Sequence, residues 1–176
     1  MRLGKNGFTL VELAVAIGIA SLVCSAAGVA TIQLLRGTGR NSEHLATTRQ
    51  LQNAGYWITR DAQRAQTVET DKPLPDFLVL HWTEWDDPEN PTYHRARYFF
   101  EDLTNGVGKL KRGYQSTGGG SEQVALIAGN MYYAPADVDH TSKASYESPL
   151  LSIRLTAPLG ETLRTMEFQT KHRPNL

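Results

Sequence analysis

An uncharged stretch near the N-terminus is the feature that most constrains this chain. From Leu13 to Leu35 there are 23 consecutive residues without an acidic or basic side chain. A helix of about 20 apolar residues spans the hydrocarbon core of a bilayer. The stretch therefore predicts a membrane-crossing helix or an equally apolar export signal, with a polar domain behind it.

The rest of the chain is polar and electrically balanced. Of the 36 charged residues, 33 lie in residues 36–176, and 18 basic residues balance 18 acidic ones. Because there is no excess of positive charge to neutralise phosphates, no nucleic-acid partner is predicted. The single cysteine, Cys24, excludes an intramolecular disulfide and any zinc site that needs two or more cysteines.

The residues before the apolar stretch are short and basic, with Arg2 and Lys5. Basic flanks stay in the cytoplasm, which places the N-terminus inside and the bulk of the chain outside. Two ordinary interpretations fit this pattern. One is a secretory signal peptide cleaved near residues 25–27 or 28–30, and the other is a plain signal anchor.

Glu12 suits neither ordinary interpretation. A carboxylate inside an apolar segment costs about 2.5–3.5 kcal/mol at the centre of a bilayer and less near the interface. Leu or Val would anchor the helix better at this position. Glu12 is therefore a functional candidate, and the alternative is that it is merely tolerated close to the membrane surface.

The apolar stretch opens with Gly7-Phe8-Thr9-Leu10-Val11-Glu12-Leu13. With the basic leader before it, this segment resembles the cleavage and methylation motif of type IV pilins and type II secretion pseudopilins. The resemblance implies that a prepilin peptidase cuts between Gly7 and Phe8, and that the new N-terminal Phe8 is N-methylated. It also implies that Glu12 is an assembly carboxylate, paired with the Phe8 ammonium of a neighbouring subunit.

The same resemblance implies a structural subunit and no enzyme. Its partners would be the prepilin peptidase, other pilins through their N-terminal helices, and membrane lipid before assembly, with no cofactor. The chain would sit in the inner membrane with its N-terminus inside and then enter a periplasmic or cell-surface filament. Arg60-Asp61-Ala62-x-x-Ala65, together with Leu110 and Arg112, is similar to a J-type (PilW-like) minor pseudopilin, and an H-type subunit is the alternative.

Residues 41–67 are expected to form an amphipathic helix. Its apolar stripe would be formed by Leu51, Ala54, Ile58, Ala62 and Ala65, which recur every three or four positions. Two alternatives stay open before it: a break at Gly37 and Gly39, with Asn41 or Ser42 capping the restart, or one continuous helix over residues 8–66.

Beyond Pro73 the apolar period changes to two, which predicts antiparallel strands. The expected strands cover residues 77–82, 93–100, 109–114, 150–155 and 165–170, and residues 124–127 and 131–133 are short apolar runs. Turns are expected at Asn105-Gly106 and at residues 158–160, and loops at 86–91 and 116–121. The predicted fold is α+β, one long helix packed on an antiparallel sheet. The predicted segments are a cleaved leader at 1–7, a membrane or filament-core helix at 8–35, and a pilin-like globular domain at 36–176.

No catalytic motif accompanies this layout, and the five histidines lack ligand spacing. Two acidic loops could offer oxygen ligands to calcium, but neither matches an EF-hand, so no metal site is assigned. These are Asp86-Asp87 with Glu89-Asn90, and Asp137 with Asp139. Trp82, Trp85, Tyr132 and Tyr133 form either an exposed aromatic surface or, as we favour, core and edge cover. The rival function is a secreted or membrane-anchored β-rich binding module with an ordinary signal sequence.

Overall fold

The computed structural model describes residues 9–70, 72–85 and 89–172, except for the side chains of residues 36 and 40. The chain divides into two compact units, Met1–Glu43 and His44–Leu176. Its one described helix, α1, covers Leu10–Arg64 and begins in the first unit and ends in the second.

In the first unit, all described side chains from residue 9 to residue 43 are exposed. Of the two alternatives at Gly37 and Gly39, the continuous helix is the one observed, because both glycines have helical backbone. For the same reason, Asn41 and Ser42 do not cap a second helix. The Ser42 hydroxyl instead donates a hydrogen bond of 3.0 Å to the Thr38 carbonyl, one turn back within the helix.

In the second unit, the predicted apolar stripe of α1 is confirmed. Leu51, Ala54, Ile58, Ala62 and Ala65 all have an exposed fraction of 0%. The helix ends at Arg64, three residues before the predicted end. The chain then leaves the helix because the Gln66 amide donates to the His81 carbonyl at 2.8 Å, which opens strand β1.

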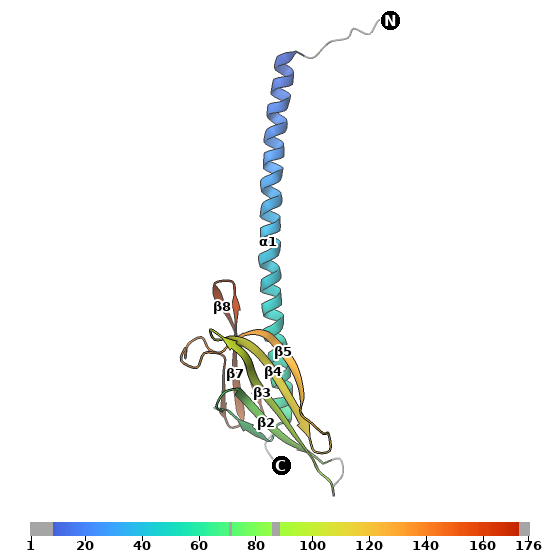
Figure 1. Cartoon of the computed structure of the whole chain (residues 1–176), viewed down its shortest axis with the longest axis vertical. Coiled ribbons are helices and arrows are strands. Elements are labelled where there is room, and N and C mark those ends of the chain that lie inside the picture. The colour runs from blue at the N-terminus through green and yellow to red at the C-terminus, as the bar shows by residue number, and fades with distance from the viewer. Residues whose placement is uncertain (1–8, 71, 86–88, 173–176) are drawn as a thin grey trace, which may run out of the picture. The chain divides into compact units, whose positions relative to one another are not determined.

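In the part of the chain that the structure describes, eight strands follow, and all of their pairings are antiparallel. The predicted α+β fold is confirmed, but the strands form two sheets and not one (Figure 1). The first sheet has the order β1-β2-β3-β4-β5 and contains β1 Thr67–Glu69, β2 Asp76–Glu84, β3 Thr92–Thr104, β4 Val107–Ser116 and β5 Gln123–Tyr132. The second has the order β6-β7-β8 and contains β6 Lys143–Glu147, β7 Leu150–Leu159 and β8 Thr162–Lys171.

Two hairpin turns were predicted from the sequence, one at Asn105-Gly106 and one around residues 158–160. Asn105 and Gly106 have φ angles of 52° and 78°, which is the left-handed backbone that an Asn-Gly hairpin turn requires. The closing hairpin predicted around residues 158–160 is confirmed, because β7 pairs with β8 up to Leu159 opposite Thr162, and the turn itself falls at Gly160 and Glu161. Pro158 is tolerated within β7 because β6 pairs with β7 only as far as Arg154. On the β6 side of Pro158, strand pairing therefore requires no amide proton.

Both sheets and the second half of α1 enclose one hydrophobic core. Its members include Ile58 from α1, Leu80 and Tyr98 from the first sheet, and Leu151 and Leu155 from the second. Burying one such Leu or Ile side chain contributes about 1.5–3 kcal/mol. The core therefore holds residues 44–172 together as a unit that does not depend on burial of the apolar half of α1.

Candidate assembly site

The start of α1 is closed by a reciprocal pair of side chains, Thr9 and Glu12. The Thr9 amide and hydroxyl donate to Glu12 Oε2 at 3.0 and 2.9 Å. In return, the Glu12 amide donates to Thr9 Oγ1 at 3.2 Å. This is a capping box, in which each side chain satisfies a backbone donor that the first turn of the helix leaves free.

The capping box gives Glu12 a local role in addition to the one expected of it. A carboxylate can accept about four hydrogen bonds, and here one oxygen accepts two. Within the described residues, Glu12 Oε1 accepts none. The carboxylate is therefore held at the helix start with one oxygen still able to receive a donor from outside the chain.

Thr9 is the functional residue that sequence reasoning missed. A threonine followed three residues later by glutamate, directly before an apolar run, is the standard signal of a capping box. The predicted cleavage and methylation residues, Gly7 and Phe8, lie outside the described residues, as does the leader at 1–7.

The helix behind Glu12 exposes apolar side chains on all sides. Leu13, Ile17 and Leu22 are 58%, 59% and 72% exposed, and several neighbours are similar. By length and composition, α1 is able to cross a membrane, and the most apolar window of the helix has no buried residues. Cys24 is exposed within this surface. A surface this apolar requires lipid or other apolar helices around it.

One match to known proteins falls on this region. Residues 2–28 match the family model described as the prokaryotic N-terminal methylation motif. The match supports the type IV pilin and pseudopilin family, and it implies processing by a prepilin peptidase and assembly with other pilins. Together with the apolar helix, it fits anchoring in the inner membrane. No curated protein and no solved structure matches the chain significantly.

A second carboxylate, Asp61 near the end of α1, is fully partnered. It is 3% exposed and receives two guanidinium hydrogen bonds from Arg112, Nε at 2.6 Å and Nη2 at 3.0 Å. The Tyr98 hydroxyl donates to it at 2.6 Å. Burial, and after it the Asp61 charge, raises the pKa of the Tyr98 phenol far above its ordinary value, so the phenol stays protonated. The network joins α1 to β3 and β4.

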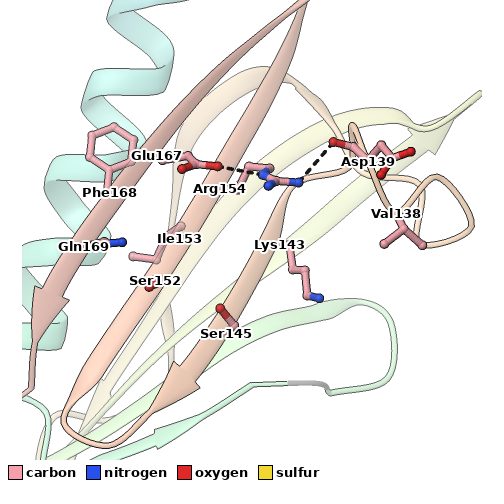
Figure 2. Close-up of a pocket in the computed structure, with 10 residues that line it drawn as sticks. All are labelled: Val138, Asp139, Lys143, Ser145, Ser152, Ile153, Arg154, Glu167, Phe168 and Gln169. Atoms are coloured by element: carbon pink, nitrogen blue, oxygen red, sulfur yellow. Dashed lines mark hydrogen bonds and ion pairs between the residues drawn. The ribbon is translucent and has the colours of Figure 1, made fainter.

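A further cluster of polar side chains lies on the second sheet. A depression of about 390 Å³ lies on the second sheet, and Figure 2 shows its residues. Within it, Arg154 donates to the Glu167 carboxylate and to the Asp139 carbonyl, both at 3.1 Å. The lining combines these charges with Lys143, Ser145 and Ser152. No nucleophile in this lining is hydrogen-bonded to a base.

The acidic loops are only partly described. Asp86 and Asp87 lie outside the described residues, whereas Asp137 accepts hydrogen bonds from Tyr132 and His140. Among residues 9–70, 72–85 and 89–172, no three His, Cys, Asp or Glu side chains gather as a metal ion requires.

The four aromatic residues do not form one exposed surface. Trp82 is 4% exposed and stacks on His94, whereas Trp85 is 64% exposed. Tyr132 and Tyr133 are half-buried. The interpretation of Trp82 as a core residue is confirmed, and Trp85 is a separate, exposed feature.

Proposed function

We propose that the chain is a structural minor pilin or pseudopilin that a prepilin peptidase processes between Gly7 and Phe8. It assembles into a type IV pilus or a type II secretion pseudopilus through its N-terminal helix. The observation that carries the proposal is the match to the methylation motif at the start of a fully exposed apolar helix. The chain has no catalytic activity of its own in this account.

The proposed organisation follows the expected boundaries. Residues 1–7 are the removed leader, 8–35 form the membrane and later filament-core helix, and 36–176 form the globular part. Arg2 and Lys5 keep the N-terminus in the cytoplasm. Lipid surrounds the helix before assembly, and the helices of other pilins replace that lipid in the filament. The similarity to J-type subunits makes a minor position in the filament our choice.

Glu12 and the new amino group of Phe8 supply the register between subunits. Each group is costly to bury alone in an apolar filament core, and pairing between neighbouring subunits offsets both costs. The geometry supports this role because Glu12 is fixed at the helix start while its Oε1 has no partner in the described chain.

Intact mass of the protein from the membrane fraction tests the proposal. We expect a mature chain of 169 residues, the 176 residues less the seven of the leader, carrying one methyl group on Phe8. Gly7→Glu should block the cut, because a small residue has to fit the peptidase at that position. Gly4→Glu is the matched control, since it places the same charge three residues away and should leave cleavage intact. A mature N-terminus at Ala27 or beyond would establish the signal-peptide alternative instead.

A further inference from the structure

The exposed face of α1 in the globular unit carries positive charge that its own helix does not neutralise. Arg49, Arg60 and Arg64 are all exposed, and none of them forms an ion pair in the described part of the chain. Between residues 44 and 64 the helix has one carboxylate, Asp61, which is buried against Arg112. No acid of α1 in the globular unit therefore meets these arginines.

The two strands that border this face do not supply the missing acid. On one side, Asn53 Nδ2 donates to the Ile127 carbonyl of β5 at 2.8 Å, and β5 contains no charged residue. On the other side, the acid of β8 is Glu167, which is ion-paired with Arg154 at 3.1 Å. The elements beside the face therefore leave its positive charge uncompensated.

A groove of about 500 Å³ lies along this face, between α1 and β8. Phe168 on β8 forms one wall, and Figure 2 shows its ring beside the helix. The ring fits there because Gly55 has no side chain; a Cβ at Gly55 would lie 2.3 Å from two ring carbons. Tyr56, which is 59% exposed, forms the other wall. The space between the two rings suits an aromatic or aliphatic side chain.

Arg60 adds a cation to this aromatic groove. Its guanidinium carbon lies 5.2 Å from the centre of the Trp57 ring, a cation–π contact that orients the side chain before a ligand arrives. Gln52 and Gln63 also line the groove, and their amide groups can both donate and accept hydrogen bonds. A guanidinium pairs with a carboxylate through two parallel hydrogen bonds. The lining therefore matches an apolar side chain that has an Asp or Glu close to it.

We propose that this groove binds an acidic segment of a different filament subunit. An aromatic or aliphatic side chain of that subunit lies between Tyr56 and Phe168, and its carboxylate pairs with Arg60. The inference rests on the proposed function, in which α1 is the element of assembly and the chain occupies a minor position. A minor subunit has other subunits, and not copies of itself, as neighbours. A protein partner is favoured over nucleic acid because the chain as a whole carries no net charge.

Photo-crosslinking from Gln52 tests the docking. Benzoylphenylalanine replaces Gln52 in the full-length chain, in cells that carry the native assembly machinery, and membranes and sheared filaments are both irradiated. We expect an adduct with a different subunit that has a processed, methylated N-terminus, at a position within about four residues of an Asp or Glu. An adduct with a copy of this chain, with nucleic acid or at a site without such an acid would overturn the proposal, as would the absence of any adduct.

Charge reversal at Arg60 makes the result specific. Arg60→Glu places like charge against the acidic segment and should lower the crosslinking yield by about tenfold or more, whereas Arg60→Lys keeps the charge and should retain most of the yield. Lys171→Glu is the matched control. It makes the same change of charge at an exposed residue of β8 that points to the opposite face of the strand from Phe168. Equal yields in Arg60→Glu and Lys171→Glu would contradict the role of the groove.

A charge swap separates loss of the contact from loss of folding. The acid mapped on the partner is replaced by lysine, which should lower the yield with the wild-type chain and restore it with Arg60→Glu. Since a misfolded Arg60→Glu chain could not be rescued by a change in its partner, restoration supports the direct pair. A yield with Arg60→Glu that stays low in the swapped pair would overturn the proposal.

The same samples separate this inference from the proposed function. The mass of the mature N-terminus reports processing whether or not the groove is used. Correct processing at Phe8 with filaments but without the adduct to a different subunit would refute only the docking contact. An unprocessed chain, or one cut near Ala27, would refute the proposed function.

Discussion

Two carboxylates on the same helix, Glu12 and Asp61, show how differently the two units are stabilised. Asp61 is 3% exposed, and both of its oxygens are occupied by donors from Tyr98 and Arg112. Glu12 is exposed, and only one of its oxygens is used, by Thr9 three residues away. The globular unit satisfies its acid internally, whereas the apolar helix leaves its acid with capacity for an external donor.

The surrounding apolar side chains show the same difference. The stripe from Leu51 to Ala65 is covered by the two sheets, whereas the described side chains from residue 9 to residue 35 are exposed. Apolar surface and a half-used carboxylate therefore occur together in the first unit, as the proposed assembly through this helix requires.

The largest expected effect comes from removing the charge of Asp61. Asp61→Asn leaves the Arg112 guanidinium, whose side chain is 15% exposed, without its counter-ion, and breaking such a pair costs up to about 3–5 kcal/mol. Urea unfolding of the full chain in detergent, followed by tryptophan fluorescence, measures the loss. Asp102→Asn is the matched control, because its ion pair with Lys109 is exposed and should be worth less than about 1 kcal/mol. Equal losses in the two variants would refute the central place of Asp61.

Gly55→Ala should be the next most damaging change. A Cβ at Gly55 would meet the Phe168 ring at 2.3 Å, and overpacking of this kind costs about 1–3 kcal/mol. Gly28→Ala is the control in the other unit, because a Cβ there meets nothing within 4 Å and alanine favours the helix by about 1 kcal/mol. Thermal unfolding followed by circular dichroism should show a lower melting temperature for Gly55→Ala and an equal or higher one for Gly28→Ala. If Phe168→Leu, added to Gly55→Ala, restores the melting temperature, the loss of stability comes from the contact between position 55 and the Phe168 ring.

A smaller effect concerns acid sensitivity of the globular unit. The hydrogen bond from Arg97 holds the pKa of the Glu122 carboxyl below its usual range. A carboxyl whose pKa is lower in the folded state stabilises the fold above its unfolded pKa of about 4.3, and this contribution is lost as the pH falls through the folded pKa. In Glu122→Gln, the free energy of unfolding should therefore decrease less between about pH 5 and pH 3 than in the wild type. The difference should be less than about 1 kcal/mol, because the pair is partly exposed. An unchanged decline would refute the Arg97 contribution.

Local patterns in the sequence predicted the parts of the fold that local rules determine. The apolar stripe of α1 and the Asn105-Gly106 turn are confirmed because helical spacing and left-handed turn preference belong to short segments. The short apolar runs at 124–127 and 131–132 belong to one strand, β5, because its pairing with β4 continues across both through bulges. Strand β6 was missed because its residues 143–147 have little apolar alternation, and pairing with β7 defines it.

The side-chain sites also differ in whether short-range sequence patterns predict them. The Thr9–Glu12 box was readable from its spacing, although only Glu12 was singled out. The buried triad of Asp61, Tyr98 and Arg112 was not readable, because its members come from three elements separated by up to 51 positions. Gly55 likewise depends on Phe168, a residue from the last strand. Contacts of this kind become visible only once the sheets are assembled.

Incorporation of Glu12→Gln into filaments tests the central claim most directly. Glutamine keeps the capping box and removes the charge, so the helix start is preserved. Processing at Gly7 and Phe8 should continue, while the Phe8 ammonium loses its counter-ion in the apolar core. A buried charge without a partner costs about 3–5 kcal/mol, so the ratio of subunit in sheared filaments to processed subunit in the membrane should fall about a hundredfold or more. Glu43→Gln removes the other exposed acid of the first unit and should match wild type. Wild-type incorporation of Glu12→Gln would contradict the account.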